Sequence, residues 1–526
     1  MKFSFRALGF SISIVGFACA AAVAEVRMPA VFSDGMVLQR DMPVPVWGTA
    51  SPGEKITVTL GKSKTETTAG TNGQWKVALR RLKAGGPYTL TAAGASNAVT
   101  ATNVLVGEVW LASGQSNMEF GLGGATNAPT EIAAAQFPEI RQFSARQHVA
   151  IDGPTNNLEG AWTVCSAQTA ARFSAVAYFF ARDLHQKLKT PVGIVSVPWS
   201  GMNIQPFMIR DVVQVAPQCA FVREYWREYE TNYPALKAAF DKAMERWAQD
   251  AEKAKTDGKP EPKKPQPPVE PARKPMDYGR VYDGMVGPLV PYAIRGAIWY
   301  QGESNGGEGD RYRKLFPEMI REWRQAWGEG DFPFLFVQLA NFMDRKTDPN
   351  AISAWAELRE AQSMTLLAAP RTAMAVAIDI GEARDIHPRN KQDVGRRLAL
   401  GARVIAYGER RLEYSGPVYE SMAIEGNAVR LKFAHAGGGL AAGLAAKGDK
   451  LTGFAVAGED RKWAWADAKI DGRTVVVSSP EVAKPVAVRY AWGDNPDCNL
   501  LNREGLPASP FRTDDWPRPE PAAAKK

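Results

Sequence analysis

The sequence predicts an α/β protein in which a three-layer, parallel-sheet domain is flanked by N-terminal and C-terminal β-sandwich-like domains. Between about residues 104 and 409, apolar strand-like runs alternate with helical patterns. Such alternation is typical of a parallel sheet covered by helices on both faces. Residues 25–103 and 410–514 instead show short strand-like runs separated by turn residues, which is the pattern of a β-sandwich. A chain of 526 residues is long enough for several cores.

Residues 1–24 have the pattern of a secretory signal peptide. Lys2 and Arg6 form a basic start, a short apolar stretch follows, and Ala22-Val23-Ala24 is a small-residue cleavage signal. Cys19 is a poor site for lipid attachment, because the residues before it do not resemble a lipoprotein cleavage motif. No later stretch is long and apolar enough to span a membrane. We therefore expect a secreted or periplasmic protein.

In the N-terminal domain, residues 25–103, the run that contains Pro43 and Pro45 is expected at a sheet edge. Proline has no N–H to donate to a neighbouring strand. The C-terminal domain, residues 410–514, shows the same short strand-like runs. Residues 515–526 are rich in Pro, Ala and Lys and are expected to form a disordered tail.

The central domain, residues 104–409, carries the alternating elements. The expected strands are residues 104–112, 192–197, 293–300, 334–339 and 373–380, and the expected helices are residues 175–188, 351–367 and 391–406. An insertion at residues 212–276 interrupts this pattern with a long charged helix, residues 221–255, and a segment rich in Lys, Pro and Glu. A solvated excursion is the favoured interpretation, and a functional arm is the alternative.

Composition excludes several classes of partner. Much of the formal charge of +8 lies in the Lys/Pro-rich segment and the C-terminal lysines, and no basic stretch is interleaved with aromatic residues, so we expect no nucleic-acid binding. No phosphate-binding glycine motif follows a strand. Cys165, Cys219 and Cys498 form no zinc pattern and leave disulfide pairing open. The oligomeric state is not readable from the sequence.

Polar or glycine-containing turns follow four of the expected core strands. They are Ser-Gly-Gln-Ser-Asn-Met-Glu at 113–119, Trp-Ser-Gly-Met-Asn at 199–203, Gln-Gly-Glu-Ser-Asn at 301–305 and Asp-Ile-His-Pro at 385–388. Because the carboxyl ends of parallel strands lie at one edge of a sheet, we expect these turns to converge. Ser116 is placed to attack an acyl carbon if a base takes its proton. Taken alone, it fits a helix cap equally well.

His387 is the histidine best placed to act as that base. It follows a core strand and has an acid two residues before it. His185 has the pattern of a surface helix residue, and His148 and His435 lie in loop-like or β-rich stretches. Histidines this scattered, without paired cysteines, argue against a metal site.

At these residues the chain resembles the sialate O-acetylesterase family of the SGNH (GDSL-like) hydrolase superfamily. The four turns correspond to the family's blocks. The stretch at residues 32–40 resembles the family's start, and those at residues 490–496 and 505–514 resemble its end. The resemblance implies a flavodoxin-like catalytic domain and no cofactor or metal. It departs at Ser200-Gly201-Met202, where the family usually has Gly-Gly-Thr, and at Arg384, where the wider superfamily has Asp.

The resemblance implies a role for each residue of the site. Ser116 is the nucleophile and His387 the base, and the oxyanion hole is formed by Ser116, Gly201 and Gln301. Asp385 is the expected partner of the imidazole, with Glu303 and Asp379 as alternatives. Asn117, Asn305 and Glu303 are further candidate contacts in the site.

These roles predict a secreted esterase that removes acetyl groups from sugars, with 9-O-acetyl sialic acid the leading substrate by resemblance. An acetylxylan or other hemicellulose esterase is the nearest alternative. A non-catalytic carbohydrate-binding protein is the alternative from another class. The intact Ser116, Gln301 and His387 count against it.

Overall fold

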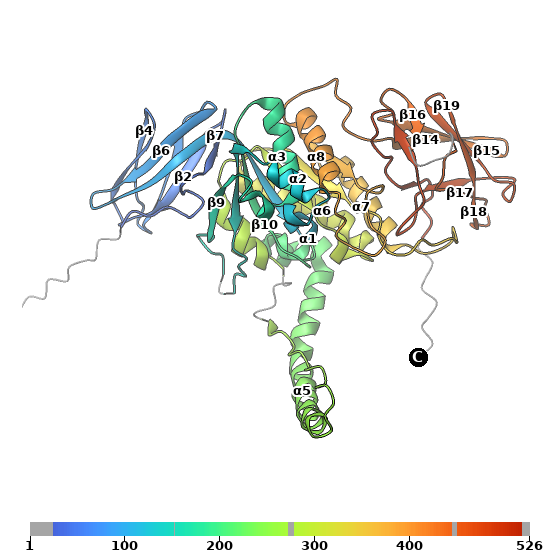
Figure 1. The fold of residues 1–526 in the computed structure, drawn as a ribbon, viewed down its shortest axis with the longest axis horizontal. Coiled ribbons are helices and arrows are strands. Elements are labelled where there is room, and N and C mark those ends of the chain that lie inside the picture. Colours follow the sequence, from blue (N-terminus) through green and yellow to red (C-terminus); the bar gives the residue numbers. More distant parts are fainter. Residues whose placement is uncertain (1–24, 152, 272–277, 444–449, 518–526) are drawn as a thin grey trace, which may run out of the picture.

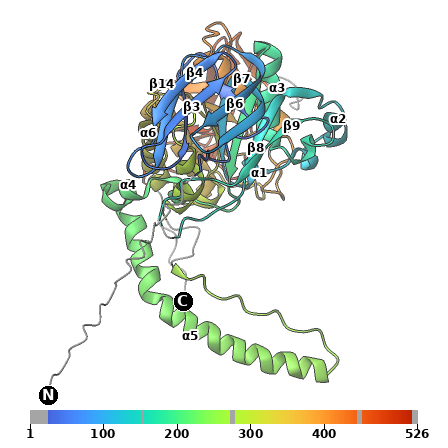
Figure 2. The same cartoon turned by 90° about the vertical axis from the view of Figure 1, so that its left-hand side faces the viewer.

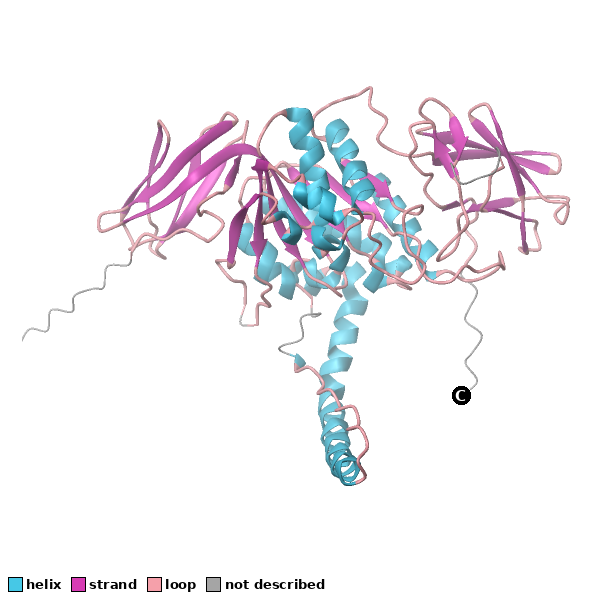
Figure 3. Cartoon of the chain, in the orientation of Figure 1, coloured by secondary structure: helices cyan, strands magenta, loops and turns pink. Residues whose placement is uncertain are grey.

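The computed structural model describes residues 25–151, 153–271, 278–443 and 450–517. An α/β region lies in the middle of the molecule, between two β-rich regions (Figure 1). The helices are concentrated in the middle region (Figure 3). One long helix, α5 (Ala220–Thr256), projects away from the rest (Figure 2). The predicted signal peptide and residues 518–526 of the predicted tail lie outside the described residues.

The middle region is built on a central sheet with the strand order β13-β12-β11-β7-β10-β8-β9. Its strands are β7 (Ala98–Gly114), β8 (Phe137–Ala145), β9 (Gly160–Cys165), β10 (Val192–Pro198), β11 (Gly296–Tyr300), β12 (Phe334–Gln338) and β13 (Thr372–Val376). All neighbours along this order are parallel except β8 and β9. The sheet is therefore mixed, not purely parallel as expected, because the chain returns beside β8 without a crossover helix.

Helices cover both faces of this sheet. The helices are α1 (Ser116–Glu119), α2 (Ala128–Ala133), α3 (Ala175–Leu188), α4 (Arg210–Val215), α5, α6 (Gly309–Trp327), α7 (Ala354–Ala368) and α8 (Lys391–Ile405). Along β7, Val109 and Leu111 share a core with α6 and α7, whereas Trp110 and Ala112 share one with α3 and α8. This alternation gives three layers. The expected helices α3, α5, α7 and α8 are confirmed to within a few residues, while α6 was not singled out from the sequence.

The N-terminal β-rich region and the central sheet share one continuous strand. The region contains β1 (Val37–Gln39), β2 (Val44–Thr49), β3 (Lys55–Leu60), β4 (Ser63–Thr68), β5 (Gln74–Leu79) and β6 (Gly85–Ala93). β7 pairs with β6 and β1 in its first half and with β10 and β11 in its second. The expected domain boundary at residue 103 therefore falls inside a strand. β2, which contains Pro45, pairs along its length with β5, and its last residue, Thr49, also pairs with Arg27.

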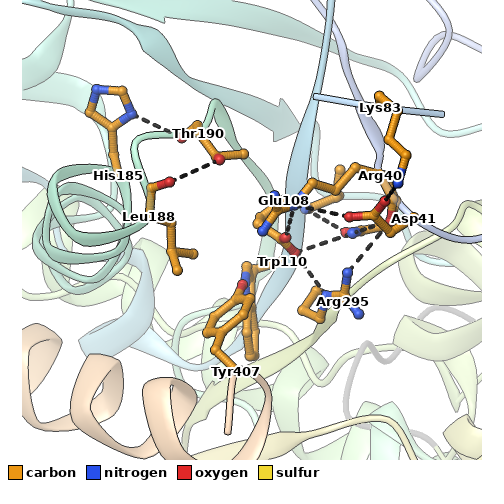
Figure 4. Close-up of polar contacts among 12 residues, drawn as sticks. Arg40, Asp41, Lys83, Glu108, Trp110, His185, Leu188, Thr190, Arg295 and Tyr407 are labelled. Atoms are coloured by element: carbon orange, nitrogen blue, oxygen red, sulfur yellow. Dashed lines mark hydrogen bonds and ion pairs between the residues drawn. The ribbon is translucent and has the colours of Figure 1, made fainter. Parts of the chain in front are cut away.

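A buried carboxylate reinforces this connection (Figure 4). Glu108 of β7 is fully buried and accepts hydrogen bonds from Gln39, Arg40 and Arg295. Gln39 and Arg40 belong to the N-terminal region, whereas Arg295 directly precedes β11. One carboxylate thus joins the N-terminal region to the central sheet.

In the C-terminal region, every regular secondary-structure element among the described residues is a strand. They are β14 (Val418–Glu425), β15 (Ala428–Ala434), β16 (Leu440–Ala442), β17 (Phe454–Ala457), β18 (Trp463–Trp465), β19 (Asp467–Asp471), β20 (Thr474–Ser478), β21 (Ala487–Tyr490), β22 (Leu500–Asn502) and β23 (Phe511–Arg512). They form sheets in the orders β14-β15-β20-β19, β18-β17-β21-β23 and β16-β22. That both β-rich regions are separate, sandwich-like domains stays a prediction.

Across the described ranges, no helix combines the length and the apolar character needed to cross a membrane. Cys165, Cys219 and Cys498 are free thiols.

Candidate active site

Ser116 lies at a sharp turn between β7 and α1. Gly114, the last residue of β7, has φ of +130°, a value that residues other than glycine rarely adopt. A Cβ atom at Gly114 would lie 2.2 Å from the carbonyl oxygen of Tyr300 on β11. Glycine is therefore required both by the backbone conformation and by the neighbouring strand.

The turns after β7, β10 and β11 meet at one edge of the sheet, as expected. In the sheet register, Gly114 is level with both Pro198 of β10 and Tyr300 of β11. The side chain of Gln115 connects two of these turns, because its Oε1 accepts hydrogen bonds from the N–H groups of Gly302 and Ser304, each at 3.3 Å.

The structure brings the fourth turn to the same place and pairs Ser116 with His387. Nε2 of His387 lies 2.8 Å from Oγ of Ser116. The other three histidines have different surroundings. His185 lies on α3 with Nδ1 at 2.9 Å from the carbonyl oxygen of Thr190 (Figure 4). His435 pairs with Glu413, and the carbonyl of His148 lies against Gly284.

Asp385 is the carboxylate beside His387, but its contact with the imidazole is loose. Its Oδ1 lies 3.6 Å from Nδ1 of His387 and accepts the backbone N–H of the same residue at 2.8 Å. The side chain of Asp385 is 50% exposed. The carboxylate therefore supports the backbone of the turn more directly than it supports the ring.

The two alternative acids have other partners. Asp379 forms a two-pronged ion pair with Arg397 of α8, at 2.6 and 2.7 Å. Glu303 is partly buried and accepts a hydrogen bond from the side chain of Asn117. Burial raises the pKa of Glu303, and its Oε2 atom has no hydrogen-bond partner among the described residues.

Lys391 is a residue of this site that the sequence did not reveal. It is the first residue of α8, its side chain is fully buried, and its ammonium donates to Oδ1 of Asn117. The nitrogen also lies 4.9 Å from the ring centre of Phe120 and 5.4 Å from that of Tyr300. Burial lowers the pKa of Lys391 to about 7. A lysine at the start of a helix is usually exposed to solvent. The sequence therefore contained no indication that Lys391 would be buried in the site.

The three groups expected to form an oxyanion hole have different surroundings. No described residue accepts a hydrogen bond from the backbone N–H of Ser116 or Gly201. Gly201 has φ of +73° and open space where a Cβ would stand. Gln301 is fully buried, and its Nε2 donates to the carbonyl of Met202 at 3.2 Å and to Asn305 at 2.8 Å. Its Oε1 accepts from the hydroxyl of Tyr312 at 2.9 Å.

The departure at Ser200 and Met202 has a structural counterpart. The N–H and the hydroxyl of Ser200 both donate to Glu119 of α1, at 2.9 and 2.6 Å. Met202 is buried in the core shared with α6 and α7. Ser200 thus attaches the second turn to the helix that carries Ser116.

The described residues contain no group of three or more His, Cys, Asp or Glu side chains arranged to hold a metal ion.

The chain is similar to several known proteins. A family described as carbohydrate esterase, sialic acid-specific acetylesterase, matches residues 274–402. The sialate O-acetylesterase of Rattus norvegicus is 30% identical over 74% of this chain and 76% of its own length, and that of Mus musculus is 28% identical over 92% and 94%. A crystal structure of a carbohydrate acetylesterase from Xanthomonas citri is 39% identical, with a TM-score of 0.78, over 94% of this chain and 100% of that chain.

Fold, site and relatives together define a carbohydrate esterase. Within that class, the chain belongs to the sialate O-acetylesterase family.

Proposed function

We propose that this protein is a secreted carbohydrate O-acetylesterase that acts through Ser116 and His387, with 9-O-acetylated sialic acid as its leading substrate. The observation that carries the proposal is the 2.8 Å contact between the Ser116 hydroxyl and Nε2 of His387. An imidazole at hydrogen-bond distance can accept the hydroxyl proton as the oxygen attacks. The relatives supply the substrate class, and residues 1–24 supply the proposed export signal.

In the proposed first step, Oγ of Ser116 attacks the acetyl carbonyl carbon and its proton passes to Nε2 of His387. The tetrahedral intermediate then collapses, and the departing sugar oxygen takes that proton. In the second step, His387 removes a proton from water, the resulting hydroxide attacks acetyl-Ser116, and acetic acid leaves and gives its proton to the solvent, forming acetate. The serine recovers its proton from the imidazolium.

The backbone N–H groups of Ser116 and Gly201 are the proposed donors to the oxyanion. Both lack an acceptor among the described residues, and the open space at Gly201 leaves the approach clear. Each such donor contributes roughly 3 kcal/mol to transition-state stabilisation. We assign Gln301 a positioning role, because its carboxamide holds the carbonyl of Met202, the residue after Gly201. Asn305 supports Gln301, and Asn117 supports the turn of His387.

The decisive experiment compares hydrolysis of p-nitrophenyl acetate by the wild-type chain and by Ser116→Ala. We expect kcat to fall by about a thousandfold or more, because the nucleophile is removed. His387→Ala should behave in the same way. His435→Ala is the matched control, since His435 pairs with Glu413 in the C-terminal region, and its activity should equal that of the wild type. Equal rates for Ser116→Ala and the wild type would defeat the proposal.

Acetate release from 9-O-acetyl-N-acetylneuraminic acid and from acetylated xylan then identifies the substrate. Release from the first supports the sialate assignment. If only xylan loses acetate, that assignment fails while the serine mechanism stands.

A further inference from the structure

The side chain of Glu119 joins the helix of the proposed nucleophile to the turn after β10. Glu119 is the last residue of α1, three residues after Ser116. Its Oε2 accepts hydrogen bonds from the backbone N–H of Ser200 at 2.9 Å and from the hydroxyl of Ser200 at 2.6 Å. An O–H···O distance of about 2.6 Å is typical of a hydroxyl bound to an ionised carboxylate. One carboxylate oxygen therefore holds Ser200 by two atoms.

The strand register places these two turns beside each other. Gly114 of β7 is level with Pro198 of β10, and Ser116 and Ser200 each follow two residues later. The two turns therefore leave the sheet side by side. Glu119 connects them about one helical turn beyond the nucleophile.

A third segment also contacts the carboxylate of Glu119. Nε2 of Gln147, in the loop after β8, donates to Oε1 and Oε2 of Glu119 at 3.3 and 3.4 Å. β8 is the next strand beyond β10 in the sheet. Although Glu119 is an exposed residue, its carboxylate is therefore held by two segments of the chain besides its own helix.

Ser200 directly precedes Gly201, whose N–H is a proposed donor to the oxyanion. The peptide plane that carries this N–H begins at the carbonyl carbon of Ser200, so its direction depends on how Ser200 is held. Before Ser200, the N–H of Trp199 donates to the carbonyl of Gly114 at 2.9 Å. After it, Gly201 has φ of +73° and open space where a Cβ would stand. Ser200 is therefore the residue through which Glu119 can set the direction of the Gly201 N–H.

The hydroxyl of Ser200 lies at a position where the sequence departs from the family that it resembles. The family usually has glycine here, and glycine would leave only the backbone contact with Glu119. Glycine also has more conformational freedom than serine. Serine at position 200 thus adds a second contact and restricts the peptide that follows it.

We propose that Glu119 and Ser200 are positioning residues that orient the N–H of Gly201 toward the oxyanion. Glu119 belongs to the helix that carries Ser116, so the proposed nucleophile and the proposed donor share one support. Neither side chain takes part in the chemical steps. This inference rests on the proposed function and deepens it, because it names the contacts that hold one of its oxyanion donors in place.

Steady-state kinetics with p-nitrophenyl acetate tests the two contacts. Removing one donor from an oxyanion hole lowers kcat by about a hundred- to a thousandfold. A donor that is displaced costs less than one that is lost, so we expect Glu119→Ala to lower kcat about thirtyfold and Ser200→Ala about tenfold. KM should change little, because the oxyanion forms only after the substrate is bound. Ser200→Thr keeps the hydroxyl and should retain the wild-type kcat.

Inhibition by trifluoroacetone reports on the oxyanion directly. Oγ of Ser116 adds to the carbonyl carbon of this ketone, the hydroxyl proton passes to His387, and the carbonyl oxygen becomes an oxyanion. In Glu119→Ala, the inhibition constant should rise by the same factor as kcat/KM falls. If kcat falls while this constant stays at the wild-type value, the variant has lost active enzyme and not oxyanion binding, and the inference is overturned.

A double variant and a control complete the test. Because Glu119 and Ser200 act through one contact, the variant that carries both alanines should lose about as much activity as Glu119→Ala alone. Glu159→Ala removes another exposed carboxylate, which pairs with Arg146 at 2.9 Å, and it should hydrolyse p-nitrophenyl acetate like the wild type. Additive losses in the double variant would overturn the inference, as would wild-type kcat in Glu119→Ala.

The same measurements separate this inference from the proposed function. If Ser116→Ala keeps the wild-type rate, the serine mechanism fails and the positioning role falls with it. If Ser116→Ala is inactive while Glu119→Ala and Ser200→Ala are fully active, the esterase mechanism stands and the positioning role alone is refuted.

Discussion

Asn117 lies between two ionisable side chains, the partly buried Glu303 and the fully buried Lys391. It donates to Glu303, accepts from Lys391, and also donates to the carbonyl of Ile386 at 2.9 Å. Ile386 directly precedes His387. Lys391 and Glu303 therefore act on the proposed base through one carboxamide, and we regard both as positioning residues.

The buried amine of Lys391 makes stability depend on pH. Burial lowers its pKa to about 7, against 10.5 in an unfolded chain, so the unfolded state binds more protons between these values. Stability should rise with pH across this window, by up to about 1.4 kcal/mol per pH unit. The carboxyl groups of Glu303, Asp385 and Glu382 face the amine and oppose part of the shift. We expect the Tm of the wild type, relative to that of Lys391→Met, to increase between about pH 7.5 and 9.5.

The matched control for this measurement is Lys314→Met, which removes an exposed lysine from α6. Its Tm should follow that of the wild type at every pH. A constant difference between the wild type and Lys391→Met would show that the buried amine does not titrate in this range. In the active range, Lys391→Met should also lower kcat for p-nitrophenyl acetate with little change in KM, as expected for a misplaced base.

At the scale of elements, the turn at residues 381–388 holds His387 mainly through its backbone. The N–H of Gly381 donates to Asn341 at 2.7 Å, and the carbonyl of Ala383 accepts from Met343 at 3.0 Å. Asn117 holds the carbonyl of Ile386, and Asp385 accepts the N–H of His387. The imidazole is thus placed by a fixed loop, with a half-exposed carboxylate 3.6 Å from Nδ1.

This arrangement predicts that Asp385 contributes modestly to catalysis. Ion pairs that are exposed to water contribute less than about 1 kcal/mol, so Asp385→Asn should lower kcat/KM less than about tenfold. A buried triad carboxylate would cost about ten-thousandfold. Kinetics with p-nitrophenyl acetate distinguishes the two cases, and Asp344→Asn, in a neighbouring loop, serves as the control. A loss of a thousandfold or more would mean that Asp385 closes onto the imidazole when substrate binds.

The four strand-end turns were predictable, because a sheet of parallel strands gathers their carboxyl ends at one edge. The loose position of Asp385 was not predictable, since residue spacing does not report how far a side chain lies from a ring. Gln301 and Lys391 illustrate the same limit. Gln301 lies in the polar turn after β11 and is fully buried, while Lys391 has the pattern of a solvated helix start and is also buried. Burial of a polar side chain depends on partners that are remote in sequence, here Tyr312 and Asn117.

Two elements, α6 and β9, show the limits of predicting structure from hydrophobic periodicity. It located α3, α5, α7 and α8 closely, because their apolar residues recur at helical spacing. It did not single out α6, which contains Pro317 and many charged residues, although its apolar face covers the sheet. The antiparallel β9 was missed as well, because pairing direction depends on how the chain returns to the sheet.

At the scale of the whole molecule, the N-terminal region and the central sheet share one strand across the predicted boundary at residue 103. β7 belongs to both, and β1 adds parallel to it through residues 105–107. The buried Glu108 then receives hydrogen bonds from both sides of the junction, from Arg40 and from Arg295. Loss of order in one part therefore removes both a strand and a charge partner from the other.

This coupling makes Glu108 the most informative position for stability. Glu108→Ala leaves two guanidinium groups without their shared carboxylate, and breaking a buried pair in this way costs about 3 kcal/mol or more. We expect a large drop in Tm by scanning calorimetry, together with faster proteolysis on both sides of the junction. Glu66→Ala is the matched control, because Glu66 pairs with Lys64 on the surface of β4 and should leave Tm unchanged. The opposite result would be faster proteolysis of the N-terminal region only, with p-nitrophenyl acetate hydrolysis lost at the same temperature as in the wild type. In that case the two parts unfold separately, and the coupling through β7 is refuted.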